Sequence, residues 1–531
     1  MKNVYAKEAI SQIPRILSVM DRNVSSPTYG CFYRPYWHDK ATDIASSHTQ
    51  MCVLPLALVY KHKFPGSSYH GKKKILEWAV AGMKFWAGIQ KDDGSFDEHY
   101  PNEHSFGAAA WTLYAVAEAF ILLKNEIVEK ETILKAMVKA GDFLMKNDEP
   151  GKITNHQIIA AYCLYKLHQI TGDEKYLSAF EEKLKVTLDR QSEEGWFLEY
   201  DGCDLGYLTT TISFLAKIFR DTKRKDVMES ARKAIEFSSY FMYPNGFYGG
   251  IVGSRHTTHF HPHGYELLAK HVPAAAAMSD KAAGGIRKGF GLVPAAMDQK
   301  YLPNLVIEFL LSYLDFSISR RKAKLPCDSK PFQKYFPDAG MVAAKNGYYF
   351  VANMKKGGVF QTFHGDMSFV DSGITSSDGG KTIATGWLDD SYKISVQNDN
   401  LAVSGNFHEI PYDYLSSRKM IISRAYLSSV GSKGSFYTKK MLIDRLITKN
   451  KKHPAVFERN IRLGKDIEIV DMVHGNIKKV TMNSVFAPRY VPASRYFQLH
   501  ELDSHDIEIE LKENHVRRVV DGKTLKVSFG Q

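Results

Sequence analysis

Apolar residues recur at helical spacing throughout the first 320 residues of the chain. One stripe, on a helix that opens near Asn155, consists of Ile158, Ala161, Tyr162, Tyr165 and Ile170. The same spacing predicts further helices at 45–61, 70–90, 105–124, 131–146, 174–190, 206–221, 223–239 and 302–320. Turn sequences such as KDDGSFD and KNDEPGK separate them, so the helices come in pairs with a repeat of roughly 45–50 residues. Paired helices of this kind form either an open solenoid or a closed or partly closed (α/α) toroid.

The pattern changes beyond about residue 340. Short alternating or β-branched runs such as GYYFVANM, YKISVQ, MIISRAYL, DIEIVDMV and TLKVSF follow one another there, separated by clusters of Gly, Asn, Asp and Lys. Such runs are typical of an antiparallel β-sandwich or barrel. We therefore expect a multidomain α+β protein with a helical domain at 1–325, a linker at 326–340 and an antiparallel β-domain at 341–531.

Charge narrows the class of partner. The chain has 70 Lys and Arg residues against 58 Asp and Glu residues, a formal net charge of +12. Such an excess favours an anionic partner. The sequence shows neither a dense basic helix nor a nucleic-acid-binding motif, so an acidic polysaccharide is favoured over nucleic acid. No stretch is long and apolar enough to predict membrane insertion, and the sequence leaves the oligomeric state open.

The cysteines and the N-terminal segment indicate the cellular compartment in which the protein is expected. The five cysteines are widely spaced and include no CxxC pair, so neither a disulfide framework nor a zinc finger is expected. The first residues contain no apolar run of the signal-peptide type. As it stands, the sequence predicts a cytoplasmic protein, or a periplasmic or secreted one if an export signal has been removed.

Three short motifs carry the candidate chemistry. Asn155 and His156 open a helix, Tyr207 follows in DGCDLGYLTTT, and His364 lies in VFQTFHGDMSFVDSG within the first strands of the β-domain. This order resembles that of the heparinase II/III-like and related alginate lyases. The segments CFYRPYWHDKATDIASSHTQMCVLPLALVY and GSFDEHYPNEHSFGAAAWTLYAVAEAF also resemble bacterial members of that superfamily, so the similarity covers most of residues 30–375.

The resemblance implies an incomplete (α/α) toroid followed by a β-sandwich, and a polysaccharide lyase activity. It assigns Asn155, with a histidine alongside, to neutralise the substrate carboxylate, and Tyr207 to act as acid, or as both acid and base. Family members commonly carry HGHAD where this chain has FHGDMS, with a single histidine. The resemblance therefore leaves His364 as either a catalytic residue or a metal ligand. No full ligand set supports a structural zinc in the β-domain, and no metal residue is assigned.

The expected reaction explains why these residue types are needed. In β-elimination a base removes the C5 proton of a uronate, next to the carboxylate, and the 4-linked oxygen leaves. Donors aimed at the carboxyl group must stabilise the developing dianion. A histidine side chain ordinarily titrates near neutrality, so His156 suits the base. A tyrosine, with an ordinary pKa of about 10, suits the acid and needs a positive environment to act as a base.

Other polar residues are candidates for substrate binding. The segment GSRHTTHFHPHGYE predicts a loop that lines a glycan cleft, with Arg255 and His256 contacting carboxylates or hydroxyls. Three histidines of this segment would face one way in an extended strand, as metal ligands do, but the proline among them favours the cleft loop. Glu103 and His104 lie between two predicted helices, and Trp37 lies in CFYRPYW.

Each residue alone also has an ordinary structural explanation. Asn155 is a good helix N-cap, Tyr207 has apolar neighbours and suits a core, and His364 could be half buried in a strand. Glu103 and His104 could cap the helix that begins at Ser105. Only the joint order of the motifs favours function.

Three other functions remain alongside the lyase. A uronyl C5-epimerase uses the same proton abstraction and returns the proton on the other face of the sugar. A toroid glycoside hydrolase needs two carboxyl groups that flank the bond, which Glu98, Glu103, Asp201 and Asp204 could supply. A non-catalytic acidic-glycan-binding protein would keep the basic cleft without the reaction. Formation of an unsaturated uronate separates the lyase from all three.

Overall fold

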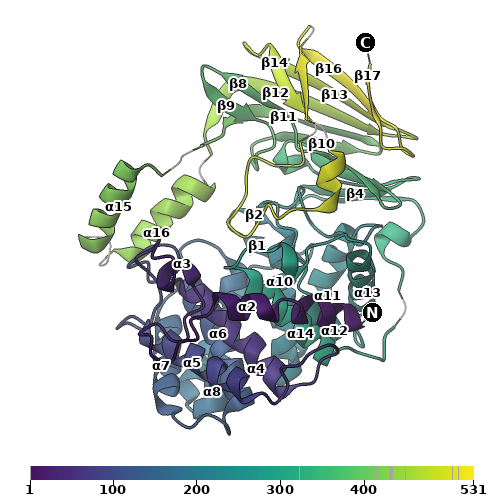
Figure 1. Cartoon of the computed structure of the whole chain (residues 1–531). Coiled ribbons are helices and arrows are strands. Elements are labelled where there is room, and N and C mark those ends of the chain that lie inside the picture. The colour runs from purple at the N-terminus through teal and green to yellow at the C-terminus, as the bar shows by residue number, and fades with distance from the viewer. Residues whose placement is uncertain are drawn as a thin grey trace.

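The computed structural model describes residues 2–530 apart from 322, 413–414, 430–433, 449, 483, 505 and 512. A helical domain forms one end of the molecule and two antiparallel sheets form the other (Figure 1). The predicted architecture, an (α/α) toroid followed by an antiparallel β-domain, is thereby confirmed.

The inner helices of the toroid pack one against the next around a ring, and the last of them lies against the first. They are α4 (Val53–Lys61), α6 (Phe106–Leu123), α8 (Thr154–Thr171), α10 (Leu205–Thr222), α12 (Pro262–Leu268) and α14 (Leu302–Leu314). Their side chains form one large apolar core. By length and composition α6 could cross a bilayer, contrary to the expectation from sequence, but 83% of it is buried in this core.

The outer helices lie behind the inner ring and, apart from α1, are amphipathic. They are α1 (Lys2–Ile10), α5 (Lys73–Gly88), α7 (Glu131–Lys146), α9 (Glu174–Leu188), α11 (Lys225–Ser238) and α13 (Pro273–Arg287). Shorter elements complete the domain: α2 (Ile13–Val19), α3 (Arg34–Trp37), η1 (Ser47–Cys52), η2 (Ser239–Phe241), η3 (Pro294–Ala296), and the two-residue strands β1 (Leu198–Glu199) and β2 (Gly202–Cys203). All five cysteines are buried and unbridged.

A five-stranded sheet lies between the toroid and the rest of the β-domain. Its strands follow chain order: β3 (Phe332–Phe336), β4 (Met341–Lys345), β5 (Tyr349–Asn353), β6 (Val359–His364) and β7 (Met367–Asp371). The central strand β5 is buried on both faces. One face packs on the toroid, where the Phe363 ring stacks on Tyr243 at 4.3 Å. The other face packs against the larger sheet.

The larger sheet has ten strands, with β11 (Asn400–Glu409), β12 (Lys452–Leu463) and β13 (Ile467–His474) at its centre. The others are β8 (Thr375–Asp378), β9 (Lys381–Ala384), β10 (Lys393–Gln397), β14 (Lys479–Met482), β15 (Ile507–Glu510), β16 (His515–Val520) and β17 (Val527–Gly530). Two fully buried arginines, Arg459 and Arg518, each pair with both Asp371 and Asp471. Because Asp371 belongs to the smaller sheet, these ion pairs tie the two layers together.

Two segments of the β-domain return to the toroid (Figure 1). The first is a pair of helices, α15 (Ser417–Ser429) and α16 (Ser435–Ile443), which stands away from the sheets and reaches the toroid edge near α3. There Asn102 donates to the Leu427 carbonyl at 3.0 Å. The second is the segment 484–504 between β14 and β15, which contains η7 (Leu499–Asp503). Both bring β-domain cations to carboxylates of the toroid: Lys439 of α16 lies beside Glu149, and Arg489 pairs with Asp201.

The structure differs from the sequence expectation at the junction and in the number of helices. The predicted linker 326–340 contains a short helical turn, η4 (Pro326–Asp328), and the strand β3, so the first sheet begins inside it. Helix α13 was not predicted, because it is rich in alanine and glycine. The run MIISRAYL, predicted as a strand, lies instead in the helix α15, and α16 was not predicted within the β-domain either.

Candidate active site

The amino ends of α8 and α10 share one rim of the toroid, where the β1–β2 hairpin joins them. Ile153, just before α8, forms a β-bridge with Glu199 of β1. Strand β2 leads directly into α10, where the Asp204 carboxylate caps the helix by accepting from the Tyr207 amide at 3.1 Å. Asn155 and Tyr207, far apart in the sequence, therefore lie on the same rim.

Asn155 does not cap its helix. Helix α8 already begins at Thr154, so Asn155 lies in the first turn, with 1% of its surface exposed. Its Nδ2 donates to Glu199 Oε1 at 2.5 Å and its backbone N–H to Oε2 at 3.2 Å. Burial raises the pKa of Glu199 to about 8, so this carboxyl group is largely protonated at neutral pH. Asn155 Oδ1 is buried and has no partner among the described residues.

Tyr207 keeps its proton at neutral pH. Burial, and then the nearby hydroxyls of Tyr200 and Tyr301, raise the pKa of Tyr207 well above its ordinary value. The ring of His259 lies 5.3 Å from the Tyr207 ring, centroid to centroid. This environment disfavours a phenolate. The sequence left two roles open for Tyr207, acid alone or both acid and base, and the environment favours the acid.

Two arginine side chains lie at Tyr200 and Asp201. Tyr200 has a φ of +61°, a left-handed conformation that is uncommon for a tyrosine and is often found at functional sites. The guanidinium of Arg255 lies 5.0 Å from the centre of the Tyr200 ring and pairs with Asp201. Arg489, from the segment between β14 and β15, pairs with the same carboxylate. Two guanidinium groups therefore pair with one carboxylate at this rim.

His156 belongs to a chain of charged groups that reaches into the β-domain. Its Nδ1 lies 2.8 Å from Glu149 Oε2. Lys439 of α16 lies 2.9 Å from the other oxygen of Glu149 and 3.9 Å from Glu103 Oε1. Although burial disfavours the charged form, Lys439 and His156 lower the pKa of Glu149 to about 2. The α15–α16 helices thus contribute a cation to the site, which the sequence did not indicate.

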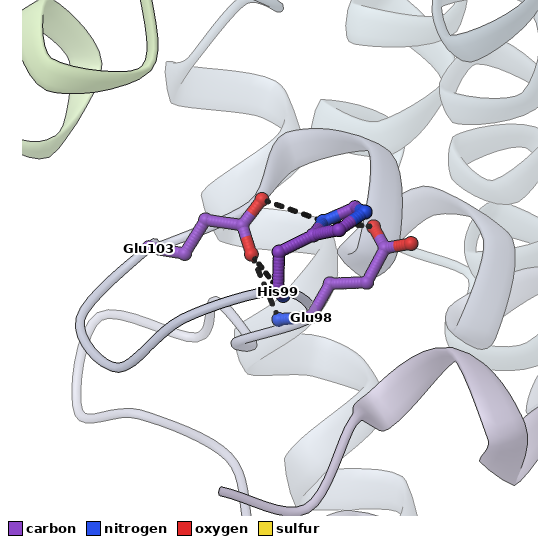
Figure 2. Close-up of side chains that lie close together, drawn as sticks. All are labelled: Glu98, His99 and Glu103. Carbon is purple, nitrogen blue, oxygen red and sulfur yellow. Dashed lines mark hydrogen bonds and ion pairs between the residues drawn. The ribbon is translucent and has the colours of Figure 1, made fainter. Parts of the chain in front are cut away.

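Figure 2 shows the neighbouring group formed by Glu98, His99 and Glu103, whose ligand atoms all lie within 4.8 Å of one another. The His99 Nδ1 is 3.8 Å from Glu98 Oε2 and 3.5 Å from Glu103 Oε1. Burial opposes the charge of His99, but the two carboxylates raise its pKa. Lys300 lies 3.0 Å from Glu98. With cations already paired to both carboxylates, we interpret this group as a charge network rather than a metal site.

His48 is a site residue that sequence reasoning missed. It lies in η1, next to the ring of Tyr301 at 5.2 Å, and its Nε2 is 3.0 Å from Asn304 Oδ1. Burial lowers the pKa of His48 to about 4, so it is neutral. Its Nδ1 is buried and has no hydrogen-bond partner among the described residues, although Glu98 Oε1 lies 3.9 Å away. His48 lies in the stretch SSHTQMC, which contains no motif that would mark this histidine as functional.

The other predicted site residues lie outside this group. His364, at the end of β6, contacts the Gly347 carbonyl at 3.2 Å, and no described contact joins it to Asn155, His156 or Tyr207. His104 bonds to Asp93 at 2.6 Å and Ser95 at 2.8 Å within its own turn. Trp37 donates from its indole to the Val19 carbonyl at 2.8 Å. His256 lines a separate pocket beside the rim.

Three of the four histidines of the GSRHTTHFHPHGYE segment, His259, His261 and His263, are those that would face one way in an extended strand, and all three are buried. His261 Nδ1 lies 3.1 Å from Thr210 Oγ1, and His263 Nε2 lies 2.8 Å from Asp315 Oδ2. Burial lowers the pKa of all three. They pack in the toroid core rather than forming a three-histidine ligand group.

The chain is similar to known proteins both in sequence and in fold. Residues 40–276 match the model of a family described as the ulvan lyase N-terminal domain. The chondroitin AC lyase of Streptomyces coelicolor A3, solved with chondroitin sulphate, is similar with a TM-score of 0.56 and 10% identity over 90% of this chain and 68% of that one. Heparinase III is similar with a TM-score of 0.49 and 14% identity over 82% of this chain. The present chain spans only 63% of the length of heparinase III. No curated protein sequence matches the chain.

Proposed function

We infer that this chain, a member of the polysaccharide lyase superfamily built on an (α/α) toroid, cleaves a uronate-containing acidic polysaccharide by β-elimination. The observation that carries the proposal is the convergence of Asn155, Tyr207 and Arg255 on the rim formed by α8, α10 and the β1–β2 hairpin. Elimination needs an acid, a base and a carboxylate-binding group around one sugar ring.

Tyr207 supplies the proton to the departing 4-linked oxygen. Its raised pKa keeps that proton available at neutral pH. His156 acts as the base that takes the C5 proton. The Glu149 carboxylate, 2.8 Å from Nδ1, favours the tautomer with its proton on that nitrogen and leaves Nε2 to accept one. About a fifth of the His156 side chain, 21%, is exposed, so the ring is open to substrate.

The carboxylate of the substrate requires fixed positive charge as the second negative charge develops. Arg255 and Arg489 both pair with Asp201, and the guanidinium of Arg255 lies 5.0 Å from the centre of the Tyr200 ring. Asn155 is held in place by the protonated Glu199 and contributes its amide to the same rim. Both features stabilise the transition state more than the ground state, where the carboxylate carries only one charge.

The decisive experiment compares the wild type with Tyr207→Phe on a panel of acidic polysaccharides that starts with ulvan and chondroitin sulphate. Ultraviolet absorbance of the unsaturated uronate reports elimination, and binding is measured in parallel. We expect the wild type to release the product from at least one polymer. We expect Tyr207→Phe to bind the polymer and to lose roughly 10²–10⁴-fold in kcat, the usual contribution of a general acid.

Tyr437→Phe is the matched control, because this tyrosine is 76% exposed on α16. It should keep the wild-type turnover. Polymer binding by the wild type without any unsaturated product would favour the epimerase, the hydrolase or the binding protein over the lyase. Wild-type turnover in Tyr207→Phe would remove this residue from the mechanism.

A further inference from the structure

An open pocket lies at the edge of the toroid, between the loops on either side of α3 and the end of α5. Its lining includes Tyr29, Tyr36, Lys40, Thr42, Lys84 and Phe85. The volume of the pocket is about 720 Å³, within the range of roughly 300–1,000 Å³ that is usual for small-molecule sites. A water molecule takes up only about 30 Å³, so the pocket has room for a ligand of many atoms. None of the residues assigned to the reaction lines it.

The pocket lies near the candidate active site. Thr42 precedes His48 by six positions, and six residues span at most about 22 Å. Asp43, next to Thr42, pairs with Arg424 of α15 at 3.2 Å, and the neighbouring helix α16 carries Lys439 to the catalytic rim. A polysaccharide is longer than this separation, so a polymer in the candidate site can reach the pocket with sugar units outside the reacting one.

The uncharged part of the lining suits a sugar ring. Tyr29, Tyr36 and Phe85 contribute aromatic rings, which present apolar faces to the C–H groups of a sugar. The hydroxyls of the two tyrosines have no hydrogen-bond partner in the described part of the chain, so both can bond to a ligand. Thr42 adds a further hydroxyl. Apolar and aromatic walls with a few polar groups are typical of ligand sites.

The charged part of the lining favours an anion. Lys40 makes no ion pair with any described residue, and the buried Asp21 that it influences electrostatically already accepts from Thr28 at 2.6 Å. Lys84 pairs at 2.5 Å with Glu129, whose side chain is 75% exposed, and such exposed pairs are weak and readily exchanged. Of the described residues that line the pocket, none is Asp or Glu.

We propose that this pocket is a secondary saccharide subsite, which binds an acidic sugar unit of the polysaccharide away from the reacting sugar. The aromatic rings contact the sugar ring, and the two lysines bind its acid group. A second copy of this chain is a poor occupant, because it carries a net charge of +12 and the pocket is lined by cations. The proposal takes the class of polymer from the proposed function, but binding at the pocket does not require the reaction.

The first test measures binding alone, by retardation in native gels that contain ulvan or chondroitin sulphate. All proteins carry Tyr207→Phe, so that the polymer stays intact. We expect Lys40→Met combined with Lys84→Met to raise the apparent Kd roughly tenfold at low salt, since each exposed charge contact contributes a few-fold in affinity. The effect of the lysine variant should shrink at high salt. Tyr36→Ala, which removes a ring and no charge, should weaken binding at both salt concentrations.

The matched control removes two exposed lysines of α7, Lys135→Met with Lys139→Met, and therefore has the same net charge as the lysine variant. It should bind like its parent. Equal losses in the control and the lysine variant would reduce the effect to net charge and overturn the proposal. Unchanged binding in the lysine variant, or a parent that neither polymer retards, would overturn it as well. The lysine variant decides the outcome if Tyr36→Ala does not fold.

The second test rests on the proposed function. The kcat and KM of the wild type and the lysine variant are measured on a polymer that the wild type cleaves and on the shortest oligosaccharide that it cleaves. Because the pocket lies away from the reacting sugar, we expect the KM to rise on the polymer only and kcat to stay unchanged on both. An equal rise in KM on both substrates, or a lower kcat, would overturn the proposal. Absence of elimination by the wild type would count against the proposed function, and the gels would still test the pocket.

Discussion

Gly107 gives a sharp test of His156, because its lack of a side chain makes room for the imidazole. Gly107 lies in the first turn of α6, and a Cβ atom placed there would be 2.5 Å from His156 Cε1 and 2.6 Å from Nδ1. Ordinary contacts of a Cβ atom are 3.4–4 Å, so in Gly107→Ala the ring must move by about 1 Å. The ring would then leave its position against Glu149, 2.8 Å away in the wild type.

A displacement of this size in a catalytic group costs roughly 10²-fold in rate, or about 2.7 kcal/mol of transition-state stabilisation. We expect Gly107→Ala to lose between about 10- and 100-fold in kcat and to change KM little. Its folding should survive, because alanine favours a helix over glycine by about 0.5–1 kcal/mol, which offsets part of the steric cost.

The assay is the release of unsaturated uronate under saturating polymer, with thermal unfolding measured on the same samples. The matched control is Gly88→Ala at the end of α5, where an added Cβ meets nothing within 4 Å. This variant should keep the wild-type turnover and unfold at the same or a slightly higher temperature. A stable Gly107→Ala enzyme with wild-type kcat would refute the assignment of His156 as the base.

Two further predictions concern charged groups at the rim. In Lys439→Met, Glu149 loses the cation that lies 2.9 Å from one of its oxygens, so the pKa of this carboxyl group rises from about 2 and it becomes protonated at a higher pH. The acidic limb of the kcat/KM pH profile should move to higher pH, and an unmoved profile would show that the α15–α16 helices act only as support. Glu199 has a pKa of about 8 in the folded state against an ordinary 4.5, so between these values the folded protein binds the additional proton and loses stability as pH rises, by up to about 1.4 kcal/mol per pH unit. Glu199→Gln should remove this component, so denaturant unfolding at pH 5 and pH 8 should show the variant gaining stability relative to wild type at the higher pH; an identical pH dependence of the two proteins would contradict a buried, protonated Glu199.

The order of helices and strands could be predicted from the sequence, because periodicity is a local property. The segment 131–146 was predicted with the bounds that the structure shows for α7. Turn signals likewise placed Asn155 and Tyr207 near the starts of two helices. Where a helix was rich in alanine and glycine, as in α13, the apolar pattern was too weak to indicate it.

The tertiary structure decided which groups surround those two residues. Lys439 reaches Glu149 across 290 positions of the chain, and Arg489 reaches Asp201 across 288. Such pairs leave no local pattern, because they depend on where the β-domain folds back onto the toroid. The same holds for the protonation of Glu199, which follows from its burial between α8 and the β1–β2 hairpin. The sequence by itself thus determined the elements and the candidate acid and base, whereas only the packing of the two domains determined the charges and donors that tune them.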